Sequence, residues 1–216
     1  MRNRLILIST IVRSSLVPFM LPCIIMYVLL PLLCLSMSNI EDEEYMMQRV
    51  FYAAQILIPV SGMLWPMVYL QIRIDSDGQE AIRSCQYCSN TCIWDLVLLE
   101  AILLLLLAPA IILFSYVYGF RLGEFFRLFT QITFTYGLLY LLSALLQNVS
   151  MSGMVVISYM FFSAIFSDNR AIASMCVIQN TLTTVDNIVW FYVPILVLSV
   201  LSYYFAHIVE KKYTPK

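Results

Sequence analysis

The chain has 216 residues, of which 62% are hydrophobic and 12% charged, and its formal net charge at pH 7 is −1. Ordinary globular domains carry about 25% charged residues, so this composition excludes a soluble protein with a conventional polar surface. The mean hydropathy of +0.87 indicates instead a chain that resides in a lipid bilayer.

Six apolar stretches take up most of the chain. They lie near residues 15–37, 50–70, 93–118, 125–146, 151–167 and 188–207. At a rise of about 1.5 Å per residue, about 20 residues cross a hydrocarbon core of about 30 Å, and all but the fifth stretch reach that length. Their apolar runs are continuous and lack the alternation of a membrane β-barrel. We therefore predict an all-α polytopic membrane protein, with six transmembrane helices in a single domain over residues 1–216.

The segment before the first span has an amphipathic pattern. Plotted at about 100° per residue, Arg2 and Arg13 fall on one arc, and Leu5 and Ile11 fall on the opposite one. This pattern predicts an interfacial helix over residues 1–14, with its basic side toward anionic lipid headgroups. The alternative is a basic start that only orients the first span.

The distribution of Lys and Arg predicts the topology. If the chain crosses the membrane six times, one side carries Arg2, Arg4, Arg13, Arg73, Arg83, Lys211, Lys212 and Lys216. The other side carries Arg49, Arg121, Arg127 and Arg170. Because cytoplasmic loops carry an excess of basic residues, we expect both termini, and the connector between spans two and three, in the cytoplasm of a bacterial cell.

That connector, residues 71–92, contains the sequence IRIDSDGQEAIRSCQYCSNTC. A stretch over residues 78–86, which begins with Gly78 and includes Glu80, is compatible with a short helix, and two acidic residues precede it. Asp75 and Asp77 would lie at its N-terminus, where the helix dipole favours anions. The alternative is a solvated loop with local turns, since Ser, Asn and Gly are plentiful here.

The connector resembles the region of type-2 ABC exporter (ABC-2 type) permeases that carries a short cytoplasmic coupling helix. The matching residues are Asp75, Asp77, Gly78, Glu80, Ile82, Ser84, Trp94, Asp95 and Leu99. The family usually has an aliphatic pair and a proline after the acid, where this chain has Arg83 and a cysteine-rich stretch.

Other segments fit the same outline. Residues 1–14 resemble the family's elbow helix, and residues 147–152 its link between spans four and five. Residues 166–187 suit its extracellular re-entrant helices, with a plain loop as the alternative.

The resemblance implies the transmembrane subunit of an ATP-driven exporter. The chain has no GxxxxGK[ST] motif, so ATP and Mg²⁺ would bind a separate cytosolic ABC ATPase subunit, and no cofactor is expected in this chain. The residues implied to couple the chain to that ATPase are Asp75, Asp77, Gly78, Glu80, Ile82 and Arg83.

A second permease chain, the same or similar, would complete the path for an amphipathic cargo such as a peptide, an antibiotic or a lipid-like molecule. Membrane lipid is the other expected partner, and no nucleic acid is. The spans lack the paired catalytic groups that intramembrane hydrolases need, so we do not expect an enzyme. The rival class is a structural or immunity membrane protein without transport activity.

Polar residues inside the spans are candidates for lining a substrate path. They are Glu100, Gln55, Gln131 and Thr135. A charged residue within a span is costly and indicates function, so Glu100 would line the inner mouth of the path; the alternatives are snorkelling to the interface and pairing with an Arg. For the uncharged residues, hydrogen bonding between helices is the alternative.

Residues near the span ends have simpler expected roles. Trp94 and Asp95 are expected to anchor the third span at the interface. Glu124 is expected to pair with Arg121 or Arg127 in a short turn at the outer side, or these arginines contact lipid phosphate. Prolines are concentrated in the first two spans, which are therefore expected to bend.

The connector also holds three of the six cysteines, in a CxxCxxxC pattern formed by Cys85, Cys88 and Cys92. Three thiolates at this spacing could share one metal ion, but a closed zinc site needs a fourth ligand. The only histidine, His207, lies at the far end of span six. Reduced structural thiols are therefore expected here, and no metal, with a metal site as the minor alternative.

Overall fold

The computed structural model describes residues 15–37, 43–74, 92–118, 123–167, 176–180 and 188–213. The regular structure within these ranges is helical, and six helical spans are long and apolar enough to cross a bilayer. The expectation of an all-α fold with six spans is therefore confirmed, and the chain is a multi-pass helical membrane protein. The expected interfacial helix over 1–14 and coupling helix over 78–86 lie outside the described residues.

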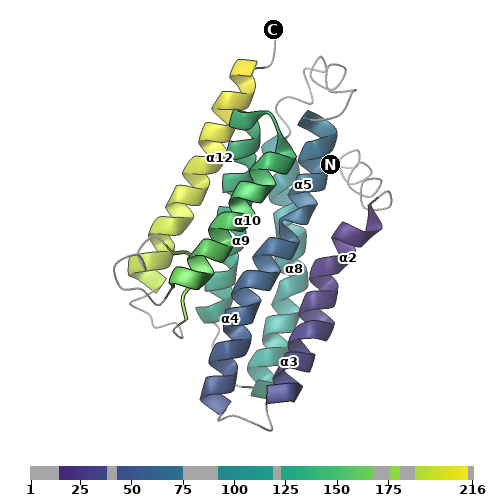
Figure 1. Ribbon diagram of the computed structural model, residues 1–216, viewed down its shortest axis with the longest axis vertical. Helices are drawn as coiled ribbons and strands as arrows, with labels where there is room; N and C mark the ends of the chain where they lie inside the picture. The colour runs from purple at the N-terminus through teal and green to yellow at the C-terminus, as the bar shows by residue number, and fades with distance from the viewer. Residues whose placement is uncertain are drawn as a thin grey trace.

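The spans follow one another in chain order (Figure 1). The first comprises α2 (Leu16–Ile24), a π-helical turn η1 (Ile25–Leu29) and α3 (Leu30–Met37). The second comprises α4 (Glu43–Gly62) and α5 (Leu64–Ile74). The third to fifth are α8 (Cys92–Tyr118), α9 (Gly123–Leu146) and α10 (Val149–Phe166). The sixth comprises η3 (Ile188–Tyr192) and α12 (Val193–Tyr213). The second and sixth helical spans extend beyond the apolar stretches 50–70 and 188–207 of the sequence.

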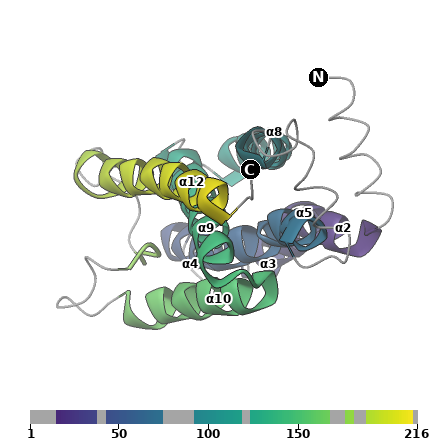
Figure 2. The same ribbon diagram turned by 90° about the horizontal axis from the view of Figure 1, so that it is seen from above.

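Helix α9 is the centre of the bundle. It contacts α4, α5, α8, α10, α12 and η3, and Figure 2 shows it between α10 on one side and α8 and α12 on the other. Every residue from Thr130 to Gly137 is buried, which covers more than two full turns and therefore all faces of the helix. A helix that is buried all round lies in the interior of a bundle rather than at its lipid face.

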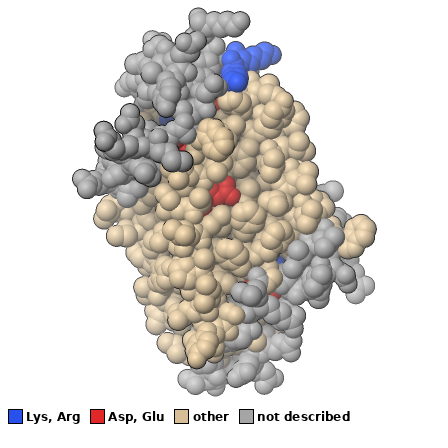
Figure 3. Space-filling model, turned by 180° about the vertical axis from the view of Figure 1, so that it is seen from behind, with Lys and Arg blue, Asp and Glu red and all other residues tan. Residues whose placement is uncertain are grey.

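The outer helices present apolar side chains where lipid is expected. On α8, Leu105, Ile112 and Tyr116 are exposed, and on α12, Val200 and Tyr204 are exposed. Figure 3 shows that the described part of this side of the molecule is almost uncharged, with basic side chains at one end and an acidic group near its middle. Such a surface is stable only in contact with lipid or with another apolar protein surface.

The second span is interrupted between α4 and α5, at Met63. Pro66 has no N–H and cannot donate to the carbonyl of Gly62, four residues earlier. The hydroxyl of Tyr136 on α9 donates to that carbonyl instead, at 3.0 Å. The neighbouring helix thus satisfies the backbone group that the proline leaves free, as a lipid environment requires. In the first span, the π-helical turn η1 begins three residues after Pro22.

Helices α9 and α12 approach each other closely at Gly137. A Cβ atom at this position would lie 2.9 Å from the carbonyl oxygen of Ser199 and 3.3 Å from Cδ2 of Tyr203. Small residues allow membrane helices to pack with their backbones close together, and Gly137 has this role here.

Replacing Gly137 by alanine should therefore destabilise the protein by about 1–3 kcal/mol, because the new methyl group meets a backbone atom that cannot move away. Gly153→Ala is the matched control, since its Cβ would meet only the flexible side chain of Met67. Thermal unfolding of the purified protein in mild detergent measures both changes. Equal losses in the two variants would contradict the packing argument.

Candidate functional site

Buried polar side chains gather at three levels along α9. We call the end of the bundle where α5 and α8 meet residues 75–91 the connector end. The connector-end cluster comprises Tyr69, Arg73, Asp95, Tyr140 and Glu210. The middle cluster comprises Glu100, Thr133 and Tyr203. The far-end cluster comprises Gln55, Glu124, Arg127, Gln131, Ser163, Tyr192 and the segment 176–180.

The far-end cluster is built around a short non-helical segment, residues 176–180, which lies between α4, α9 and α10. Cys176, Val177 and Ile178 are buried, with 0%, 3% and 0% exposure. Burial raises the pKa of the Cys176 thiol, which therefore stays neutral and packs as a small apolar group. The polar groups of buried non-helical backbone need hydrogen-bond partners within the protein, and helix side chains supply them here.

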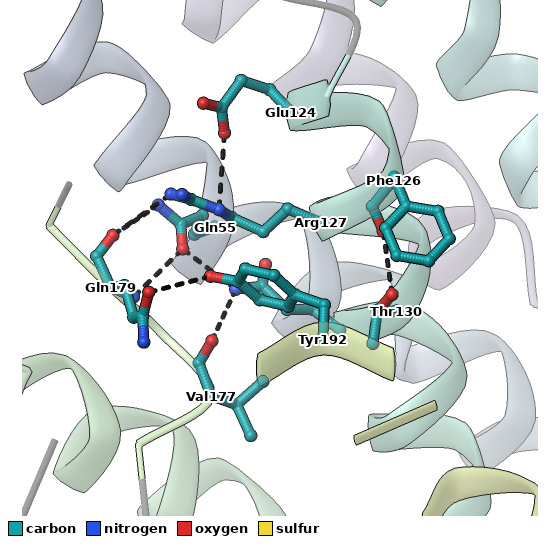
Figure 4. A network of polar contacts seen from close by, with 9 residues as sticks. Gln55, Glu124, Phe126, Arg127, Thr130, Val177, Gln179 and Tyr192 are labelled. Atoms are coloured by element: carbon teal, nitrogen blue, oxygen red, sulfur yellow. Dashed lines mark hydrogen bonds and ion pairs between the residues drawn. The ribbon is translucent and has the colours of Figure 1, made fainter. Parts of the chain in front are cut away.

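Two glutamines from different spans, Gln55 of α4 and Gln131 of α9, meet in this cluster. Figure 4 shows Gln55 beside Gln179 and Val177 of the buried segment. Gln131 donates to the side-chain oxygen of Gln55 at 2.9 Å and to the carbonyl of Val177 at 2.9 Å. Gln55 donates to the carbonyl of Gln179 at 2.9 Å and accepts from the Gln179 N–H at 3.2 Å. The two amides thus join α4, α9 and the buried segment.

Arg127 lies beside these glutamines and is fully buried. Its guanidinium is 3.4 Å from the Glu124 carboxylate, and its Nη1 is 3.4 Å from the carbonyl of Gln179. The guanidinium carbon also lies 5.4 Å from the ring centroid of Phe51 and 5.3 Å from that of Tyr192. The pairing of Glu124 with Arg127 is as expected, but the pair is buried inside the bundle instead of lying in an exposed turn.

The middle cluster holds Glu100, which is only 6% exposed and does not extend to the interface. Its two oxygens lie 2.5 Å from the hydroxyl of Thr133 and 2.9 Å from that of Tyr203. The expected snorkelling is therefore wrong, because α9 and α12 enclose the carboxyl group. Thr133 also lies within hydrogen-bonding distance of the Phe129 carbonyl, at 2.9 Å. A hydroxyl has one proton, so both contacts of Thr133 are hydrogen bonds only if the carboxyl carries a proton too.

A neutral amide can make the same two bonds. We therefore expect Glu100→Gln to leave the free energy of unfolding within about 1 kcal/mol of the wild type, whereas Glu100→Leu should lose about 1–3 kcal/mol because it removes the partner of the buried Tyr203 hydroxyl. Unfolding in detergent with increasing denaturant compares the two variants. Equal destabilisation by glutamine and leucine would show that the carboxyl is ionised or that these bonds do not form.

The connector-end cluster joins four helices. Arg73, at the end of α5, lies 2.9 Å (Nε) and 2.8 Å (Nη2) from one oxygen of Glu210 on α12. Tyr140 of α9 donates to the other oxygen of Glu210. Tyr69, one turn before Arg73, donates to Asp95 on α8 at 2.8 Å. The interface role expected for Asp95 is wrong, since its side chain is 3% exposed and turned into the bundle; Trp94 beside it is 64% exposed.

The remaining candidates are placed as follows. Thr135 is buried and its hydroxyl donates to the carbonyl of Ile132 in its own helix. Of the cysteine pattern, Cys92 is described and buried, while Cys85 and Cys88 lie outside the described residues. In the described ranges, no group of three or more His, Cys, Asp or Glu side chains is arranged to hold a metal ion.

The expected coupling residues 75–83 also lie outside the described part of the chain.

No protein-family model, curated protein or solved structure matches this chain. The resemblance of residues 75–95 to ABC-2 type permeases therefore stays a prediction.

Sequence reasoning named Gln55 and Gln131, and the structure brings them together. It missed Ser163, Gln179, Glu210 and the four tyrosines of the clusters, which are Tyr69, Tyr140, Tyr192 and Tyr203. A partial signal for the far-end cluster was available. Gln48, which donates to the carbonyl of Asn180, is seven residues from Gln55, and Arg127 is four residues from Gln131, which places each pair on one helix face. Nothing in the sequence alone shows that these two faces meet.

Proposed function

We propose that the chain is the transmembrane subunit of an ABC-2 type exporter in the bacterial cytoplasmic membrane, driven by a separate cytosolic ATPase that binds ATP and Mg²⁺. The observation that carries the proposal is the connector-end cluster. Such a subunit cannot hydrolyse ATP, so it must receive movement from its partner through a cytoplasmic segment that is firmly joined to its spans.

At each end of the connector, the adjoining helix is bonded to another span through a side chain close to the connector. On the α5 side, Arg73 lies one residue before Ile74, the last residue of the helix, and is tied to Glu210 of α12. On the α8 side, Asp95 lies in the first turn and accepts from Tyr69 of α5. A displacement of residues 75–91 would therefore move α5 and α8 together and reach α12 through a charged pair. Tyr140 extends the same connection to the central helix α9.

The arrangement of the spans also supports the proposal. Four spans lie between the connector and the C-terminal end of α12, so both would be on the same side of the membrane. The last turn of α12 contains Lys211 and Lys212. Basic residues favour the cytoplasmic side. The ATPase would thus approach the side at which the connector-end cluster lies. A second chain would complete the path, and the apolar outer face seen in Figure 3 is of the kind that such a chain or lipid covers.

Purification of the tagged chain in mild detergent, followed by mass spectrometry of the bound proteins and an ATPase assay, tests the proposal. We expect an ABC ATPase subunit to copurify, and expect Asp77→Lys with Glu80→Lys to remove most of it, because charge reversal opposes docking at the connector. Glu44→Lys, on the side expected to be extracellular, is the matched control and should retain the partner. A stable complex without any ATPase would contradict export and favour the structural or immunity class.

A further inference from the structure

The segment 176–180 is bound largely through its main chain. Gln131 donates to the carbonyl of Val177, and the N–H of Ile178 donates to the hydroxyl of Ser163 at 2.8 Å. Both main-chain groups of Gln179 pair with Gln55. The carbonyl of the next residue, Asn180, accepts from Gln48 of α4. Consecutive backbone groups of the segment are therefore contacted by side chains from α4, α9 and α10.

The pairing at Gln55 is of the kind that a neighbouring β-strand offers. Its amide presents one acceptor and one donor to a single residue, at 3.2 Å and 2.9 Å, as an adjacent strand would. Recognition of this kind depends on main-chain groups, which every peptide carries, and very little on sequence. The site is thus suited to an extended peptide of varied sequence.

Gln131 has a hydrogen-bond acceptor that the segment 176–180 does not use. Its side-chain oxygen is buried and has no hydrogen-bond partner among the residues that the structure describes, while its nitrogen has two. The opposite orientation of this amide is excluded, because it would place the oxygen against the acceptors of Gln55 and Val177. A buried acceptor without a partner costs about 1–3 kcal/mol, so it is seldom retained without use. A peptide that also presents an N–H here would satisfy it.

We propose that Gln55, Gln131 and Ser163 form a binding site for the main chain of an extended peptide, occupied in this structure by residues 176–180. The exported cargo is then a peptide, and its backbone takes the place of this segment when it binds. The assignment of this ligand as cargo rests on the proposed export function, whereas the binding site itself rests on the contacts of the described residues.

The test uses the full-length chain in lipid nanodiscs, without any ATPase, and fluorescence anisotropy of labelled uncharged nine-residue peptides. The probes are one mixed sequence, its scrambled version, and the same peptide N-methylated at alternate residues. Ile178→Pro removes the N–H that donates to Ser163, and Gln179→Pro removes the N–H that donates to Gln55. Neither variant changes a residue of the site itself. Freeing the site raises the fraction of binding-competent protein, so we expect each variant to bind about tenfold more tightly than wild type.

Binding should be similar for the mixed and scrambled peptides. It should be at least about tenfold weaker for the N-methylated one, because the site accepts from two consecutive N–H groups and methylation at alternate residues removes one of them in any register. Adding Gln131→Leu to either proline variant should reduce the affinity again. Gln71→Leu, which changes a glutamine near the connector end, is the control and should not. Sequence-dependent binding, indifference to N-methylation, or no binding by folded Ile178→Pro and Gln179→Pro would overturn the site. Because no ATPase is present, these results are independent of whether an ATPase copurifies with the chain.

Discussion

Replacing Arg127 by methionine should lower the free energy of unfolding by about 3–5 kcal/mol, because it removes a buried cation that lies 3.4 Å from the buried Glu124 carboxylate. The side chains of both residues are only 1% exposed, so water cannot replace the lost partner. The rings of Phe51 and Tyr192 would also lose their contact with the guanidinium. Unfolding of the purified protein in detergent, followed by circular dichroism, measures the loss.

The double variant Glu124→Gln with Arg127→Met separates charge from packing. Since both groups are then neutral, we expect it to recover much of the lost stability, as replacement of a buried ion pair by neutral residues often does. Arg49→Met removes an exposed arginine from α4 and serves as the control, with an expected change of at most about 1 kcal/mol. A double variant as unstable as Arg127→Met alone would show that packing, and not charge, dominates this site.

Breaking the pair of Arg73 and Glu210 should affect transport more than stability. The side chains are 10% and 22% exposed, so partial screening limits the expected loss of stability from Arg73→Met to about 2–3 kcal/mol. The ATPase should still bind, because the expected docking residues 75–83 are unchanged. Transport should fall at least about tenfold, since a coupling of 1.4 kcal/mol already corresponds to that factor.

The double variant Arg73→Glu with Glu210→Arg exchanges the two charges and tests whether the ion pair itself is needed for transport. We expect it to restore part of the transport that either single change removes, because the link between α5 and α12 is re-formed. ATP hydrolysis and transport are measured on the same reconstituted preparation. Normal transport by folded Arg73→Met would show that the connector-end cluster does not transmit movement.

The spans could be predicted from the sequence because a bilayer imposes a minimum apolar length. All six were found in this way, although hydropathy gave the second and sixth too short. Polar residues such as Arg73 and Glu210 lie within the helices but beyond the ends of the apolar stretches 50–70 and 188–207. The prolines led to the prediction that the first two spans bend; the second span is interrupted three residues before Pro66, and a π-helical turn follows Pro22 in the first. Their consequence for Gly62, whose carbonyl accepts from Tyr136, needed the structure.

The clusters could be predicted only as single residues. Gln55 and Gln131 were recognised as polar groups in apolar surroundings, but their contact depends on how α4 and α9 are rotated against each other. Length and hydropathy do not determine that rotation. Asp95 was misread for the same reason, because its partner Tyr69 belongs to another span, 26 residues away. The buried position of residues 176–180 was not predicted either, since so short a run shows no periodicity.

Uptake of a fluorescent peptide by inside-out vesicles would decide whether the chain is a transport subunit. The vesicles are prepared from cells that produce the chain with its ATPase, so that the cytoplasmic side faces the added ATP and peptide. We predict uptake that requires both ATP and the chain, and that is lost in the Asp77→Lys, Glu80→Lys variant. Vesicles that contain both proteins but show no ATP-dependent uptake, or the same uptake as vesicles without the chain, would contradict peptide export by this chain.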